Sequence, residues 1–138
     1  MLQLDTYLFF DGNCADAMRF YERTLGGKLH LMTHGESPMA AQTPPGSANR
    51  ILHARLELDG RLLMASDSMV GQPYGGMKGF SLSLIYPTVA EARRMFAALA
   101  EGGQITMPID KTFWAEAFGM LVDRFGTPWM VNGGMASK

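Results

Sequence analysis

His53 and Arg55 have the side-chain types and the spacing to act together on a small molecule. They lie in the run ILHARLELDG, residues 51–60, whose alternation is that of a strand with two different faces. The apolar face would hold Leu52, Ala54, Leu56 and Leu58, and the polar face His53, Arg55 and Glu57. Histidine exchanges protons near neutral pH and arginine keeps a permanent charge. The pair could therefore hold an anionic or oxygen-rich ligand, with His53 as catalytic acid or base if a proton moves. A polar face that only meets solvent would show the same alternation.

The other reactive groups of the sequence are isolated. His30 and His34 would share one face of a strand, but residues four apart on a strand are separated by roughly 13 Å, too far to bind one ion. Cys14 is the only cysteine, and its place at the start of a predicted helix could lower the pKa of a thiol. Because no second cysteine is present to resolve a disulfide, we assign it no role.

Two segments about 75 residues apart repeat one helical pattern, and these helices would position the strands. Each begins with a capping box, residues 13–16 in the first copy and 88–91 in the second, and each ends at a glycine pair. Between them runs an apolar stripe at helical spacing. The stripe is Ala17, Phe20, Tyr21, Thr24 and Leu25 in the first copy and Ala92, Met95, Phe96, Leu99 and Ala100 in the second.

Strand-like runs surround both helices in the same order. TYLFF and FSLSLIY precede them, KLHLM and QITMPI follow them, and the hairpins LELDGRLLMAS and LVDRFGTPWMV close each copy. The sequence therefore predicts an α+β protein in which a βαβββ unit occurs twice. Two halves of this size have little core each, so we expect one domain or two half-domains packed together, joined by a glycine-rich linker over residues 68–79.

Composition excludes several classes of partner. The 138 residues carry a net charge of −1 with basic and acidic residues scattered singly, so neither nucleic acid nor an anionic membrane surface is expected as a partner. No apolar run approaches the length of a membrane span, and the N-terminus does not read as a secretory leader. With a single cysteine, a cytoplasmic location is the expectation.

Three stretches resemble the PhnB-like branch of the glyoxalase/bleomycin-resistance/dioxygenase (vicinal oxygen chelate) superfamily. They are YLFFDGNCADAMRFYERTLGGKL, ILHARLELDGRLLMASD and FWAEAFGMLVDRFGTPWMVN. The resemblance covers essentially the whole chain and implies a single domain, residues 1–138, with modules at about 1–68 and 79–134. It further implies a curved mixed sheet around a cavity, helices on the outside, and a homodimer.

Metal-dependent members of that superfamily hold one divalent ion with a His or Glu from the first and last strand of each module. Carried over to this chain, the four positions fall near Asp5 and Met64 in the first module and near Phe80, or its neighbour Ser81, and Met130 in the second. Three of these positions lack the oxygen or nitrogen ligands that such an ion prefers. We therefore expect no metal and no other cofactor, although a divalent metal is not excluded.

The resemblance also implies which side chains line the cavity. If the apolar faces meet the helices, the ligand-binding residues are Asp5, Tyr7, Phe9, His53, Arg55, Met64, Phe80, Trp114 and Met130. Trp114, with Phe113 and Phe118, could close over a ligand as an aromatic lid or simply pack onto its own sheet. Asp67 and Asp123 would point away from the cavity and only cap turns.

Two functions from different classes fit these features. The first is a metal-independent protein that binds a small molecule without making or breaking a bond. The alternative is a lyase or isomerase that uses His53 as acid or base, or a metal-dependent lyase or dioxygenase whose ligands lie elsewhere. Methionine at two of the four ligand positions favours binding or metal-free chemistry.

Overall fold

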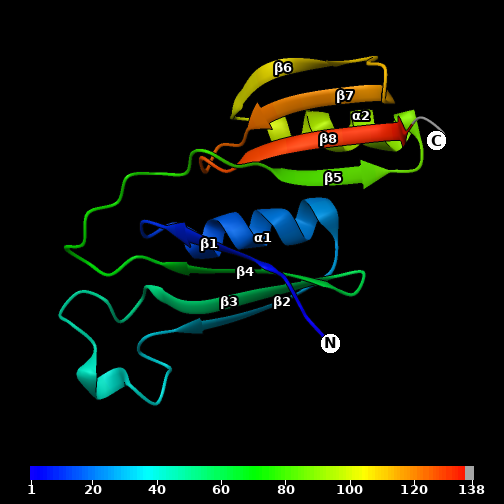
Figure 1. Ribbon diagram of the computed structural model, residues 1–138. Coiled ribbons are helices and arrows are strands. Elements are labelled where there is room, and N and C mark those ends of the chain that lie inside the picture. Colours follow the sequence, from blue (N-terminus) through cyan, green and yellow to red (C-terminus); the bar gives the residue numbers. More distant parts are fainter. Residues whose placement is uncertain (136–138) are drawn as a thin grey trace. The chain divides into compact units, whose positions relative to one another are not determined.

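The computed structural model describes residues 1–135, and the chain divides into two compact units, Met1–Gly75 and Gly76–Lys138. The first contains β1 (Thr6–Phe10), α1 (Cys14–Leu25), β2 (Lys28–Thr33), a short 3-10 helix (Ala40–Gln42), β3 (Ile51–Leu58) and β4 (Arg61–Asp67). The second contains β5 (Leu82–Tyr86), α2 (Val89–Ala100), β6 (Gln104–Asp110), β7 (Ala115–Val122) and β8 (Pro128–Met135). Figure 1 shows the order βαβββ in both units, which confirms the predicted α+β fold and its internal repeat.

Each unit has one four-stranded mixed sheet. The strand order is β1-β4-β3-β2 in the first and β5-β8-β7-β6 in the second, so the first and last strands of each unit lie side by side in parallel. A parallel pair needs a long crossover connection, which the helix and the two intervening strands supply. The remaining pairs are antiparallel.

In each unit one helix packs on one face of the sheet, and the core lies between the helix and that face. In the first unit α1 contacts β3, β2 and β4, and Leu8, Ala54 and Leu56 beneath it are at most 2% exposed. In the second unit α2 contacts β8 and β7, where Trp129 and Val131 are equally buried. Burying a large apolar side chain contributes about 1.5–3 kcal/mol, so these faces provide much of what holds each unit together.

The two units close their last hairpins differently. Asp59 and Gly60 both have positive φ angles, 46° and 81°, as a two-residue turn between antiparallel strands requires. In the second unit the loop from Val122 to Pro128 is longer, and Asp123 accepts hydrogen bonds from two backbone N–H groups within it.

The strand pairing shows that the offset between the first strands of the two units differs by one residue from the offset between their helices. The helices are 75 residues apart, from Cys14 to Val89, but Thr6 pairs with Leu63 in the first sheet as Leu82 pairs with Trp129 in the second. Because Met64 and Met130 occupy equivalent places, the counterpart of Asp5 is Ser81, and Phe80 lies before it. The first copy has one more residue between its first strand and its helix.

Two further expectations were wrong in detail. Ile51, not Leu52, is the fully buried residue at the start of β3, because a bulge between Met32 and Thr33 shifts the pairing past Leu52. The first capping box does not form, since the side chain of Asn13 makes no capping hydrogen bond. The second does form, with Thr88 Oγ1 accepting from Glu91 N–H.

Neither helix in the described part is long and apolar enough to cross a membrane.

Candidate functional site

The face of the first sheet opposite α1 carries most of the chemistry predicted from the sequence, and we call it the open face. It is formed by Tyr7, Phe9, His53, Arg55, Glu57 and Met64, none of which is buried. Alternation along the strands puts them there, because their neighbours Leu8, Ala54 and Ala65 face the helix and are buried. The ladder aligns Tyr7 with Met64 and Met64 with Arg55, so these three lie in one row across the sheet.

A hydrogen bond joins the aromatic edge of the open face to its histidine. Tyr7 Oη lies 3.2 Å from Nδ1 of His53, and the two rings are 5.8 Å apart at a shallow angle of 32°. Tyr7 belongs to β1 and His53 to β3, so the contact crosses β4. Phe9 extends the aromatic surface, with its ring 5.2 Å from that of Tyr7, and remains 56% exposed.

Charges on the open face are unevenly paired. His30 Nε2 lies 3.1 Å from Glu57 Oε2, so the carboxylate nearest to Arg55 along β3 already has a partner. Arg55 makes no hydrogen bond or ion pair with any side chain of residues 1–135. The open face thus presents an uncompensated guanidinium two residues from His53, with an exposed aromatic pair across the sheet.

The four positions implied for a metal do not supply a suitable set of donors. Asp5 Oδ2 accepts from Gln3 Nε2 at 2.7 Å, and Met64 pairs with Tyr7 rather than with Asp5. In the second unit Met130 pairs with Ser83, and Phe80 precedes β5 with 43% of its surface exposed. One carboxylate and two thioethers do not match a hard or borderline divalent ion. Among residues 1–135, no three His, Cys, Asp or Glu side chains gather to hold a metal ion.

The predicted aromatic residues of the second unit contact one another. The Trp114 ring lies 5.1 Å from Phe118 and 4.8 Å from Phe113, both edge-on. Trp114 Nε1 donates to Asn132 Oδ1 at 3.4 Å, and Asn132 Nδ2 donates to the Leu84 carbonyl. Phe118 is 4% exposed whereas Phe113 is 91% exposed, so two of the three aromatic rings pack within their own unit and Phe113 projects from it.

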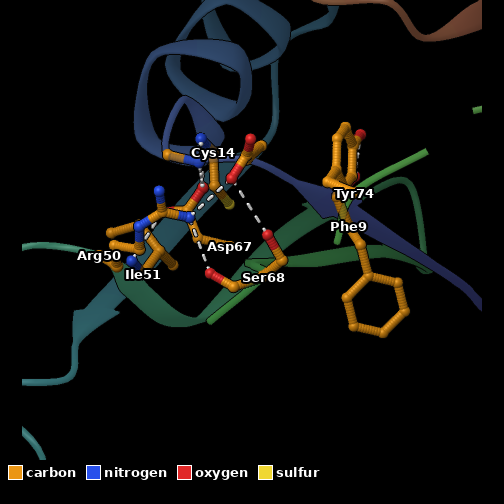
Figure 2. A network of polar contacts seen from close by, with 9 residues as sticks. Phe9, Cys14, Arg50, Ile51, Asp67, Ser68 and Tyr74 are labelled. Atoms are coloured by element: carbon orange, nitrogen blue, oxygen red, sulfur yellow. Dashed lines mark hydrogen bonds and ion pairs between the residues drawn. The ribbon is translucent and has the colours of Figure 1, made fainter. Parts of the chain in front are cut away.

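Asp67 was expected only to cap a turn, but it is a buried carboxylate that organises the first unit. Asp67, at the end of β4, accepts N–H bonds through Oδ1 from Gly12 at 2.8 Å and Cys14 at 3.0 Å, and through Oδ2 from Ile51 at 2.8 Å (Figure 2). It does point away from the open face, as expected, but it ties the start of α1 to the start of β3. His53 lies two residues beyond Ile51, so this network supports the strand that carries the site.

Arg50 adds hydrogen bonds to residues that adjoin the Asp67 network. Arg50 Nη1 donates to Asp11 Oδ1 at 3.0 Å and to the Ser68 carbonyl at 2.8 Å, and Ser68 Oγ donates to Asp11 (Figure 2). Arg50 therefore links Ser68, the residue after Asp67, to Asp11 in the β1–α1 turn. The sequence signal was the MASD motif, but two of the three partners of Asp67, Gly12 and Cys14, lie more than 50 residues away and cannot be read from it.

Cys14 is held in its unreactive form. It is fully buried at the first position of α1, and burial, followed by the nearby negative charge of Asp67, raises its thiol pKa far above the ordinary range. Burial first, and the carboxylate of Asp67 second, therefore outweigh the lowering of the thiol pKa that a helix N-terminus alone would cause. A nucleophilic role for Cys14 is not supported.

A tyrosine from the linker covers the edge of β1. Tyr74 Oη donates to the Phe9 carbonyl at 2.7 Å (Figure 2). Burial raises the pKa of Tyr74, and the negative charges of Asp11 and Asp67 raise it further, which keeps the phenol protonated as a donor. Because β1 is an edge strand, this bond occupies a carbonyl that its own sheet leaves free.

Comparison with known proteins gives a consistent family signal. Residues 3–131 match the family described as the Glyoxalase/Bleomycin resistance protein/Dioxygenase superfamily. Protein YjdN of Escherichia coli is 41% identical over 142 residues, which cover 95% of this chain and 95% of that protein.

Solved structures agree with the sequence comparison. Protein PA1353 from Pseudomonas aeruginosa is 47% identical and superposes with a TM-score of 0.90, covering 99% of this chain and all of that one. A Bacillus cereus protein described as a putative 3-demethylubiquinone-9 3-methyltransferase, PhnB protein, is 27% identical with a TM-score of 0.80, covering 96% of this chain and 100% of that one.

Proposed function

Because this chain belongs to the glyoxalase/bleomycin resistance protein/dioxygenase superfamily, with a PhnB-like protein among its structural relatives, we propose that it binds a small molecule on the open face of its first sheet. The observation that carries the proposal is the Tyr7–His53 hydrogen bond beside an unpaired Arg55. Polar groups placed among exposed aromatic and thioether side chains are the usual composition of a small-molecule site.

Different side chains of the open face would make the apolar and the polar contacts with a ligand. Tyr7 and Phe9 offer adjoining aromatic rings on which an apolar or flat ligand can pack, and Met64 lies in the same row with an adaptable thioether. His53 and Arg55 supply the polar contacts that orient the ligand. No step of this binding requires a metal ion.

The Tyr7–His53 hydrogen bond also favours one alternative, an enzyme in which His53 acts as acid or base. A histidine held through one ring nitrogen has its other nitrogen oriented for proton transfer. In that case the protein would be a lyase, isomerase or dioxygenase acting on a small oxygenated substrate. Ligand turnover, followed by NMR, separates the two functions, since a binding protein returns its ligand unchanged.

Methionine methyl groups allow the binding proposal to be tested directly. Met64 lies on the open face, whereas Met18 belongs to α1, is fully buried and serves as an internal reference. With ¹³C-methyl-labelled methionine, we expect members of a fragment library to shift the Met64 signal and leave Met18 unchanged. His53→Ala should weaken the binding of those fragments and leave the melting temperature nearly unchanged. A library that never perturbs Met64 would reject the proposal.

Metal content provides a second test. After dialysis against buffer without chelator, we expect well under one divalent ion per chain, and Asp5→Ala should not change that content, because Met64 and Met130 offer only weak thioether donors. Tightly held zinc, nickel, manganese or iron that is lost in Asp5→Ala would instead support a metal-dependent enzyme.

We also propose that the protein is a homodimer. Each unit is small and leaves strands at both edges of its sheet, and pairing between copies would cover such edges and the apolar surface beside them. Sedimentation at micromolar concentration should give about twice the 15.1 kDa of one chain. A monomer under those conditions would contradict this.

A further inference from the structure

We infer that the ligand of the open face carries a carboxylate or phosphonate group on a flat apolar body, and that His53 and Arg55 hold the anionic group. This inference rests on the proposed function and specifies its ligand. Three features of the open face lead to it: the hydrogen bond between Tyr7 and His53, the isolation of Arg55, and the exposed aromatic pair.

Tyr7 Oη and His53 Nδ1 could each be the donor of their hydrogen bond, and we assign the hydroxyl of Tyr7 as the donor. A neutral tyrosine hydroxyl that donates to Nδ1 leaves the ring proton of a neutral imidazole on Nε2. His53 then offers an N–H donor at Nε2 to a ligand, not a lone pair. Tyr7 acts here as a positioning residue, because it influences the ligand through His53.

Arg55 adds a second and stronger donor group. Its nearest carboxylate on the same strand face, Glu57, is paired with His30, and no other side chain in residues 1–135 neutralises the guanidinium. A guanidinium recognises carboxylates and phosphonates through two parallel N–H bonds. Two donor groups side by side, one of them charged, favour an anion and disfavour a cation.

The rest of the open face indicates what the anionic group is attached to. Tyr7 and Phe9 are 39% and 56% exposed, and their rings adjoin each other. Met64 completes an apolar area in the same row as Arg55. A flat aromatic body would pack on this area while its acidic group meets Arg55 and His53.

Benzoate, phenylphosphonate and the neutral isostere benzamide are suitable probes. With ¹³C-methyl methionine labelling, we expect both anions to shift Met64 with a dissociation constant at least tenfold lower than that of benzamide. Arg55→Gln should abolish this preference. Arg61→Gln, which removes one positive charge at the β3–β4 turn, should retain it. The comparison within the unmodified protein needs no variant, so it holds even if Arg55→Gln folds poorly.

Nitrogen-15 spectra of the imidazole test the role of Tyr7. The unmodified protein should show the Nε2–H tautomer of His53, and Tyr7→Phe should show a mixture with several-fold weaker benzoate binding. Equal shifts of Met64 by benzoate and benzamide would overturn the anion inference and leave the proposed function standing. If no probe or library compound moves Met64, the proposed function itself fails. A proton found on Nδ1 in the unmodified protein would overturn the tautomer argument.

Discussion

The two sheets have the same strand order and register, but they carry different side chains on the face that the helix leaves uncovered. Matching the ladders through Met64 and Met130 gives the equivalent pairs His53 and Phe118, Arg55 and Met120, Tyr7 and Ser83, and Phe9 and Ile85. The polar groups of the first face are thus replaced by apolar or neutral ones in the second. The fold depends on the helix-facing residues, which leaves the opposite face free to diverge in chemistry.

The helix starts differ as well. In the first unit Asp67, from a neighbouring strand, accepts the N–H groups of Gly12 and Cys14 at the start of α1. In the second, Thr88 caps α2 locally, and the residue equivalent to Asp67 is Gly133, where a Cβ would lie 2.8 Å from the Thr88 carbonyl oxygen. The start of α1 is therefore held by hydrogen bonds to a carboxylate distant in sequence, whereas the start of α2 is held by close packing and a local cap.

The largest expected difference between the units lies in these caps. Asp67→Ala would leave three N–H groups near α1 and β3 without acceptors and should lower the free energy of unfolding by about 4 kcal/mol. Thr88→Ala removes one local cap and should cost about 1 kcal/mol. Urea denaturation followed by circular dichroism measures both.

Asp67→Asn gives a control, since the amide keeps one acceptor oxygen and should lose less than the alanine variant. Equal losses in Asp67→Ala and Thr88→Ala would show that the distant carboxylate adds nothing over a local cap.

The equivalent pair His53 and Phe118 sharpens the comparison of the two faces. Phe118 is 4% exposed and packs edge-on against Trp114, so Phe118→Ala should destabilise the protein by about 3 kcal/mol. His53 is only partly buried and makes one exposed hydrogen bond, so His53→Ala should cost less than about 0.5 kcal/mol. Thermal unfolding provides the comparison, and a large loss for His53→Ala would make it a structural residue.

A substitution at Gly133 tests the close packing of α2. Gly133→Ala would press a methyl group against Ala92 and the Thr88 carbonyl and should cost about 2 kcal/mol. Gly75→Ala is the matched control, because a Cβ there meets nothing within 4 Å and the backbone needs no positive φ. Chemical denaturation of both variants should therefore separate them clearly. If the two changes have similar effects, α2 has room that the packing does not indicate.

The smallest expected difference between the two units is a pH dependence that comes from the thiol of Cys14 in the first helix. Because the pKa of Cys14 is raised in the folded state, the folded chain binds this proton more tightly than the unfolded chain does. With an unfolded thiol pKa of about 8.5, stability should be nearly constant below about pH 7.5 and should fall by about 1 kcal/mol between about pH 7.5 and 9.5. Cys14→Ala should reduce this decline. Val89, the equivalent residue of α2, has no proton to lose.

Much of the fold could be predicted from local pattern. The stripe that includes Ala17 and Phe20 predicted α1, and its copy 75 residues later predicted α2, because burial of one helix face repeats every three or four residues. The cap at Asn13 was wrong for a physical reason. The acceptor that wins, Asp67, comes from a strand 53 residues away from Cys14, and no local pattern contains that distance.

The sequence could predict which side chains share a strand face at the candidate site, but not which contacts they make. Alternation placed His53 and Arg55 on the same face of β3, and the resemblance to the superfamily implied that this face turns away from the helix. The Tyr7–His53 bond required the strand order β1-β4-β3, and the isolation of Arg55 required knowing that Glu57 pairs with His30. These are properties of tertiary pairing, which spacing along one strand does not determine.

The tight turn at Asp59 and Gly60 has a consequence for the order in which the first unit folds. It joins β3 to β4 through two residues, whereas the parallel pair of β1 and β4 must bring Thr6 to Leu63. Closing the longer loop costs conformational entropy that is offset only after the hydrogen bonds between the strands have formed. Contacts between residues close in sequence therefore form faster. We expect the β3–β4 hairpin to form early and to serve as the template on which β1 docks. Tyr7 would then reach His53 only in the last stage, so the binding face is completed after the scaffold that supports it.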